Sequence, residues 1–177
     1  MLKRETILEA FGLLSTHLKN KEVHAEICLL GGTAMVLAFQ ARQSTKDVDA
    51  IFAPVGAVRQ AARLVADELD LPQDWLNDAA KGFASEKGTF EPLTGLAFEN
   101  LRIQTPTAEY LLAMKVMAAR VAIADIRGDK EDIAFLARLL ALKSPEEALT
   151  IVEKYYDPAR ILPRSIYLLD EIFEEMK

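Results

Sequence analysis

The residues of this sequence best suited to chemistry are two aspartates, Asp47 and Asp49, separated by a single residue. They belong to the segment Asp47 to Ala53, whose valine, isoleucine and phenylalanine predict a strand. Because the side chains of a strand alternate between its faces, both carboxylates should point to the same side. Two like charges there cost stability unless a cation lies between them, and such oxygen ligands suit Mg²⁺. The spacing predicts a magnesium site, with a solvated strand end as the alternative.

A pair of glycines, Gly31 and Gly32, precedes the aspartates and could hold phosphate. The glycines follow the apolar run from Ala25 to Leu30, which predicts a buried strand, and they precede a helix-favouring segment that starts at Thr33. Glycine lets a ligand approach the backbone, and a helix N-terminus offers free N–H groups to an anion. We expect Gly31, Gly32 and Thr33 to shape a triphosphate cradle, while a simple tight turn is the alternative. Cradle and metal together are what metal-assisted phosphoryl transfer requires.

Composition and charge narrow the class of protein. A chain of 177 residues, of which 51% are hydrophobic, can bury a core as one domain, or as one domain with a helical appendage. The formal net charge of -6, with scattered lysine and arginine, argues against stable DNA binding but allows a local basic cleft for an RNA end. Only 2 histidines occur, so a zinc site or a serine–histidine–aspartate triad is poorly supported.

The cysteine content and the apolar stretches bear on location. The single cysteine, Cys28, excludes a disulfide framework within the chain and predicts a reducing compartment. We expect its thiol to be a small buried hydrophobe rather than a nucleophile. The N-terminus lacks the apolar core of a signal peptide, and the longest uncharged stretch, Ile27 to Ala41, is too short to span a bilayer. The sequence therefore predicts a soluble, cytoplasmic protein without a membrane partner.

The elements that position these residues fall into two halves with a seam near residue 105. Before the seam, apolar periodicity predicts helices at 5–19 and 56–70 and a third strand within 96–105, and the first strand–helix–strand unit suggests parallel pairing. Beyond it, the sequence predicts four helices. These run from the cap Thr105-Pro106 to about Ile123, from Asp129 to Leu142, from the capping box Ser144-Pro145-Glu146-Glu147 to about Tyr156, and onward from Pro163. We predict an α+β fold, with a small mixed-sheet core over 1–104 and a C-terminal helical bundle over 105–177 packed on it.

Taken in order, these motifs resemble the nucleotidyltransferase superfamily, in which a glycine motif is followed by a strand with an Asp-x-Asp/Glu pair. More narrowly, the chain is similar to the AbiEii-like nucleotidyltransferases of bacterial abortive-infection and toxin–antitoxin systems. The matching residues span nearly the whole chain: Gly31-Gly32-Thr33-Ala34, Thr45-Lys46-Asp47-Val48-Asp49, Pro106, Leu112-Ala113-Met114-Lys115, Arg120 and Asp129-Lys130-Glu131-Asp132-Ile133. The resemblance implies an enzyme that uses Mg²⁺ to move a nucleoside monophosphate from a nucleoside triphosphate (NTP) to an acceptor. The acceptor would be an RNA, such as the 3′ end of tRNA, or a protein, and an antitoxin partner is implied for a toxin.

The same resemblance assigns roles at the first motif. Asp47 and Asp49 would bind Mg²⁺, and Gly31 and Gly32 would contact the triphosphate. Many members of the superfamily carry a serine after the first glycine, whereas this chain has Gly32, with Thr33 as the nearest hydroxyl.

Two later residues also receive roles from the resemblance. Lys115 matches a lysine expected to touch the phosphates, and Asp132 matches an acidic position that acts as a base. The alternatives are that Lys115 reaches solvent along its helix, and that Asp132 is a first-turn acid favoured by the helix dipole. Arg120 and Asp129 are interpreted as a structural pair.

The predicted site lacks one feature of many superfamily members. A third metal-binding carboxylate is often present on a later strand, but the best candidate strand, Leu101 to Gln104, contains no acid, and Glu99 is the nearest one. The alternative to an enzyme is therefore a non-catalytic module of the same fold that acts by binding or as an antitoxin. Trp75, in a segment interpreted as helical, is expected in the core, with base stacking as the alternative.

Overall fold

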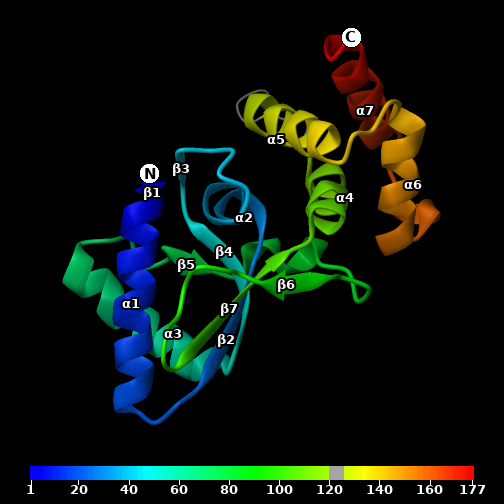
Figure 1. The fold of residues 1–177 in the computed structure, drawn as a ribbon. Helices are drawn as coiled ribbons and strands as arrows, with labels where there is room; N and C mark the ends of the chain where they lie inside the picture. The colour runs from blue at the N-terminus through cyan, green and yellow to red at the C-terminus, as the bar shows by residue number, and fades with distance from the viewer. Residues whose placement is uncertain (120–125) are drawn as a thin grey trace. The chain divides into compact units, whose positions relative to one another are not determined.

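The computed structural model describes residues 1–119 and 126–177, and the chain divides into two compact units. The first unit contains Met1–Gly82 and Phe90–Thr105, and the second contains Phe83–Thr89 and Pro106–Lys177. The short segment Phe83–Thr89 therefore belongs to the second unit although the first unit surrounds it in sequence. Figure 1 labels the helices and strands of both units.

The first unit is built on a five-stranded mixed sheet with the strand order β5-β4-β2-β7-β6. Its strands are β2 (Ala25–Leu29), β4 (Val48–Ala53), β5 (Leu76–Asn77), β6 (Phe90–Pro92) and β7 (Leu101–Pro106). A separate antiparallel pair joins β1 (Leu2–Lys3) to β3 (Ser44–Thr45). The combination of helices with a mixed sheet confirms the α+β class predicted from the sequence.

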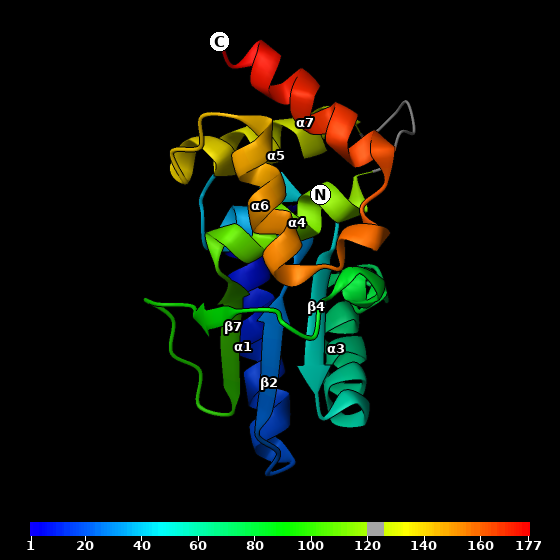
Figure 2. The same ribbon diagram turned by 90° about the vertical axis from the view of Figure 1, so that its right-hand side faces the viewer.

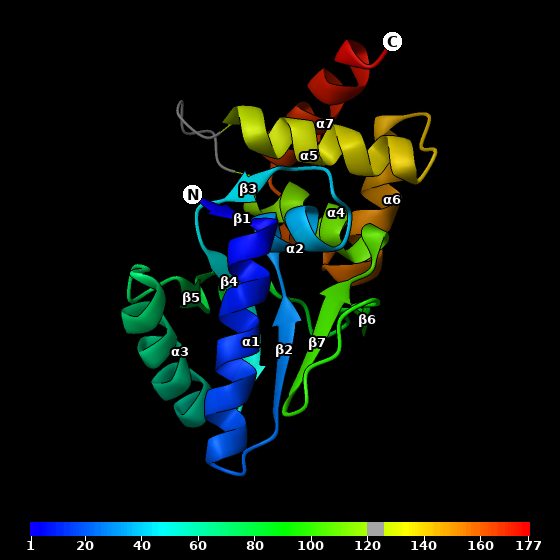
Figure 3. The same cartoon turned by 60° about the vertical axis from the view of Figure 1, so that its left-hand side comes forward.

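Helices α1 (Arg4–Asn20) and α3 (Val55–Leu69) lie together on one face of this sheet, as Figures 2 and 3 show. Both were predicted from apolar periodicity, and both bury one face. Burial alternates along the central strands, as expected for a sheet covered mainly on one side. The buried side chains of these strands are Ala25, Ile27, Leu29, Val48, Ala50, Phe52, Leu101, Ile103, Thr105 and Pro106.

The pairing of β2 with β4 is antiparallel, which corrects the parallel arrangement expected from the sequence. Parallel pairing would require the chain to return to the start of β2 before it entered β4. Helix α2 (Gly31–Leu37) has only 7 residues. After α2 the chain forms β3, which packs on α2 and pairs with β1, so it stays near the end of β2 and does not return to its start. Ala50 of β4 pairs instead with Leu29 at the end of β2, so β4 starts where β2 finishes.

Trp75 lies in the core, as expected, although not on a helix. Its side chain is buried, its ring centroid lies 6.2 Å from that of Phe11, and its Nε1 donates to the carbonyl oxygen of Ala62 at 2.9 Å. The helical interpretation of this segment was wrong because the residues that follow Trp75 form β5 and pair with β4. The core interpretation is confirmed.

In the second unit, α4 is enclosed by three other helices. The helices are α4 (Ala108–Ala118), α5 (Ile126–Leu139), α6 (Pro145–Tyr155) and α7 (Pro163–Glu175). Each of the other three packs on α4, which buries every side chain from Tyr110 to Val116. A helix that is buried all round needs partners on every side, which these helices supply.

The first turns of α6 and α7 confirm the local signals in the sequence. Ser144 caps α6, where its Oγ accepts a hydrogen bond from the backbone N–H of Glu147 at 3.4 Å, and Pro145 is the first helical residue. Helix α7 begins at Pro163, as predicted.

The start of α4 differs from the prediction. Its N-cap is Thr107, which accepts from the N–H of Tyr110, because Thr105 and Pro106 form the end of β7 instead. Helix α4 ends at Ala118, and the predicted end near Ile123 lies outside the described residues.

Candidate functional site

The first unit brings the glycine pair and the aspartate pair together at the junction of β2, α2 and β4. The N–H of Leu30 donates to the carbonyl oxygen of Asp49 at 2.8 Å. The hydroxyl of Thr33 donates to the carbonyl oxygen of Asp47 at 3.1 Å. Asp47 comes directly before β4 and Asp49 is its second residue, and both are half-buried. Thr33 and Asp47, which are separated by 14 positions along the chain, are thus held side by side by a side-chain to backbone hydrogen bond.

Gly31 lies against the carboxylate of Asp49. A Cβ atom at Gly31 would be 3.2 Å from Asp49 Oδ2, closer than ordinary van der Waals contact. The backbone of Gly31 also has a φ of +54°, in the left-handed region that glycine adopts without penalty. Two independent features therefore require glycine at position 31. One is the left-handed backbone conformation, and the other is the close approach of the backbone to Asp49, a predicted metal ligand.

Gly32 requires glycine for a different reason. A Cβ atom at this position would be 2.6 Å from the Oγ1 of Thr45, a buried residue of β3. The close contact is with a packed side chain of the protein and not with Asp47 or Asp49. Packing explains Gly32 without a ligand, whereas Gly31 faces the candidate site. Helix α2 begins at Gly31 and not at Thr33, so the expectation that the glycines precede the helix was wrong. With only 7 residues, α2 also has a small helix dipole.

Asp47 has a side-chain partner that the sequence interpretation missed. The Nδ2 of Asn77 on β5 lies 3.2 Å from Asp47 Oδ2. Asn77 also pairs in register with Asp49, because β5 runs parallel to β4. The only indication of β5 in the sequence is the apolar pair Trp75-Leu76 followed by polar residues. This pattern is compatible with a short strand as well as with a helix.

Glu99 is not placed to act as a third carboxylate. Leu101 pairs with Ala25 at the beginning of β2, whereas Asp49 lies at the other end of that strand. Glu99 precedes Leu101 and forms an exposed ion pair with Lys19 at 2.7 Å. Among the residues that the structure describes, no group of three or more His, Cys, Asp and Glu side chains could hold a metal ion. A cation here would thus be held by Asp47 and Asp49, with further oxygens from substrate or water.

Lys115 and Asp132 lie in the second unit, where they form a buried ion pair. Lys115 Nζ is 2.7 Å from Asp132 Oδ2 and 3.1 Å from Asp129 Oδ1. The exposed fraction of the side chain is 10% for Lys115 and 3% for Asp132, against 29% for Asp129. The alternative in which Lys115 reaches solvent is wrong, because its side chain is buried. The alternative in which Asp132 is a first-turn acid is also wrong, because Asp132 lies beyond the first turn of α5. Asp129 pairs with Lys115, while its expected partner, Arg120, lies outside the described residues.

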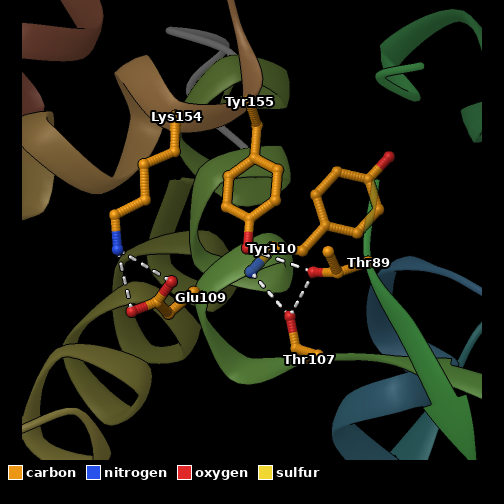
Figure 4. A network of polar contacts seen from close by, with 6 residues as sticks. All are labelled: Thr89, Thr107, Glu109, Tyr110, Lys154 and Tyr155. Carbon is orange, nitrogen blue, oxygen red and sulfur yellow. Dashed lines mark hydrogen bonds and ion pairs between the residues drawn. The ribbon is translucent and has the colours of Figure 1, made fainter. Parts of the chain in front are cut away.

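A second polar cluster in the same unit joins the segment Phe83–Thr89 to the helices (Figure 4). The Oγ1 of Thr89 lies 2.7 Å from the Oγ1 of Thr107 and 3.1 Å from the hydroxyl of Tyr155. Beside it, Lys154 forms an ion pair with both carboxylate oxygens of Glu109. These contacts link the segment to the N-terminus of α4 and to the end of α6.

Buried tyrosines complete this cluster. The hydroxyl of Tyr156 donates to the carbonyl oxygen of Phe83, and the hydroxyl of Tyr110 accepts from the N–H of Ser85 at 2.8 Å. A Cβ atom at Gly88 would lie 2.6 Å from the ring of Tyr110. Burial raises the pKa of both Tyr110 and Tyr156. Groups that hold their protons so firmly are suited to packing rather than to acid–base chemistry.

Cys28 lies on the less covered face of the sheet and is half-buried, not fully buried as expected. Its burial, followed by the nearby negative charge of Glu26, raises the pKa of the thiol. The thiolate is the nucleophilic form, so this environment disfavours reactivity. The expectation of full burial was wrong because alternate residues of β2 face away from α1 and α3.

Comparison of the chain with protein-family models, with curated proteins and with solved structures found no match. No helix in the described residues is long and apolar enough to cross a membrane.

Proposed function

We propose that this chain is a Mg²⁺-dependent nucleotidyltransferase that moves a nucleoside monophosphate from an NTP to an acceptor and releases pyrophosphate. The observation that carries the proposal is the contact between Gly31 and Asp49, in which a left-handed glycine without a Cβ lies against the carboxylate. That arrangement leaves backbone and carboxylate jointly accessible, which a triphosphate and its cation require. A simple tight turn requires only the backbone conformation.

Each residue of the site has a defined part in this proposal. Asp47 and Asp49 would hold Mg²⁺, which would neutralise charge on the triphosphate. Gly31 would allow the phosphates to approach the backbone beside the cation. Thr33 would fix the start of β4 through its hydrogen bond to the carbonyl oxygen of Asp47. Gly32 contributes through its close packing on a neighbouring side chain.

Lys115 and Asp132 enter the proposal through the family resemblance alone. In that reading Lys115 would balance phosphate charge and Asp132 would act as a base. Their mutual contact at 2.7 Å gives them a structural role whether or not they take part in nucleotide transfer. The same resemblance suggests an RNA acceptor, such as the 3′ end of tRNA, or a protein acceptor. It also suggests a cytoplasmic toxin with an antitoxin partner.

A non-catalytic module of the same fold is the second candidate, and two observations favour it. The end of β7 that lies nearest the site carries Gln104 and Thr105 rather than an acid. The ammonium group of Lys115 is already paired with two carboxylates. Such a protein would bind a nucleotide or a protein partner without transferring a group.

A transfer assay separates the two candidates. Purified protein is incubated with Mg²⁺, cell RNA and protein, and each of the four NTPs labelled at the α-phosphate. We expect label in one macromolecular fraction with the wild type, and loss of that label in Asp49→Asn. The exposed carboxylate of Asp170 on α7 provides a matched control in Asp170→Asn. Absence of label with every NTP, from a folded protein, would favour the non-catalytic module.

A further inference from the structure

Asn77 lies beside both carboxylates on a strand that is firmly held. In the parallel pairing of β5 with β4, Asn77 lies opposite Asp49. The preceding residues anchor the strand, since Trp75 is buried in the core and its carbonyl oxygen accepts from the N–H of Val48 at 2.6 Å. The position of Asn77 relative to the candidate site is therefore set by the core and not by a loop.

The orientation of the Asn77 amide follows from its two neighbours. Its Oδ1 accepts a hydrogen bond from the backbone N–H of Ala79 at 2.9 Å. The N–H of Ala79 can only donate and an ionised carboxylate can only accept, so the Nδ2 group must face Asp47. The distance from that nitrogen to Asp47 Oδ2 is 3.2 Å. Both hydrogen bonds require the same orientation of the amide.

We propose that Asn77 is a positioning residue of the cation site, which orients the Asp47 carboxylate and keeps the site at two negative charges. The inference rests on the proposed function. The amide N–H engages one oxygen of Asp47 and thereby fixes the direction of the other. Hydrogen bonds of this kind to metal ligands orient them and commonly change metal affinity by roughly 10–100-fold. An acid in place of Asn77 would be a third carboxylate next to Asp47 and Asp49.

Two substitutions act in opposite directions on this arrangement. Asn77→Ala removes the donor and releases Asp47. Asn77→Asp has the same shape and retains an acceptor for the N–H of Ala79, but it places a carboxylate oxygen against Asp47. Repulsion among three carboxylates is relieved by a divalent cation. Asn77→Asp should therefore be less stable than the wild type without metal, and more strongly stabilised when metal is added.

The test is calorimetric titration of the full chain with Mn²⁺ and with Mg²⁺, together with thermal unfolding in EDTA and in excess metal. We expect Asn77→Ala to weaken metal binding by at least roughly tenfold with its unfolding temperature in EDTA nearly unchanged. We expect the metal-induced rise in unfolding temperature to be larger in Asn77→Asp than in the wild type. Asp78→Asn, next in sequence and paired with Arg59, is the control and should bind metal like the wild type.

The outcomes distinguish this inference from the function on which it rests. If the wild type binds metal and Asn77→Ala binds it equally well, the role of Asn77 is wrong while the proposed site stands. If Asn77→Asp gains no extra stabilisation from metal, the proposed arrangement of charges is wrong. If the wild type binds neither cation at millimolar concentration, the proposed function fails, and the inference fails with it.

Discussion

Gly31 and Asp49 meet where β2 ends and β4 begins, with the Asp49 Oδ2 atom 3.2 Å from the position that a Cβ of Gly31 would occupy. The antiparallel pairing of the two strands creates this contact, because it places the start of β4 beside the residue that follows β2. A glycine and a carboxylate far apart in sequence thus share one small surface. The proposed function depends on that surface.

Gly31→Ala should impair the binding of Mg²⁺ and NTP. The added Cβ would crowd the Asp49 carboxylate, and a left-handed conformation costs a non-glycine residue about 1–2 kcal/mol. Nucleotide affinity can be measured by calorimetry and stability by urea unfolding. Gly56→Ala is the matched control, because its Cβ would enter open space on α3. Equal nucleotide affinity in Gly31→Ala and Gly56→Ala would show that the contact has no role in binding.

Gly32→Ala should lower stability through Thr45, with or without nucleotide. The new Cβ would lie 2.6 Å from the Thr45 hydroxyl, so one of the two groups must move. Thr45→Ala removes that hydroxyl and should recover part of the loss, with a coupling energy of about 0.5–3 kcal/mol in a double-mutant cycle. Strictly additive effects on the free energy of unfolding would contradict the packing explanation.

Lys115→Met should destabilise the second unit strongly. The substitution removes the Lys115 ammonium group from the buried Asp132 carboxylate, and breaking a buried pair in this way typically costs about 3–5 kcal/mol. The double variant Lys115→Met/Asp132→Leu removes both charges and should recover most of that loss. Asp129→Asn should have a smaller effect, because Asp129 is more exposed. Unfolding curves in urea test the series, and a small effect of Lys115→Met alone would contradict a structural role for the pair.

The protein should lose stability in alkali because of its buried tyrosines. Burial raises the pKa of Tyr156 above that of an unfolded tyrosine, so the native state retains a proton that the unfolded state releases. The contribution is complete below about pH 10, the unfolded value, and it declines as pH rises above it. In Tyr156→Phe the free energy of unfolding should fall less between about pH 8 and about pH 11. An unchanged alkaline slope would show that Tyr156 is not responsible.

Local features of the fold could be predicted from sequence because their causes are local. The Ser144 cap with its proline, and the proline that opens α7, act within one turn of helix. By contrast, Thr107 and Thr105 both flank Pro106 and both can cap a helix. The pairing of β7 with β2, which are far apart in sequence, places Thr105 in the strand and leaves Thr107 as the cap.

The candidate site could be predicted in part for the same reason. Asp47, Asp49 and the glycines were recognisable from residue type and spacing. The hydrogen bond from Asn77 to Asp47 depends on the pairing of β5 with the sheet. A strand of 2 residues is too short to give a recognisable pattern in the sequence. The burial of Lys115 against Asp132 depends on the packing of α5 on α4. Such contacts are set by tertiary structure, and periodicity within one helix does not indicate them.

The most direct test of the central claim is equilibrium binding of each NTP to the 177-residue chain by calorimetry, with Mg²⁺ and with EDTA. The proposed site predicts that at least one NTP binds only when Mg²⁺ is present. It also predicts that Asp49→Asn weakens this binding at least roughly tenfold, a loss of about 1.4 kcal/mol, while Asp170→Asn leaves it unchanged. Binding that is independent of Mg²⁺, or equally strong in Asp49→Asn, would contradict the assignment of Asp47 and Asp49 as the cation ligands. Absence of binding by all four NTPs would contradict the proposed function itself.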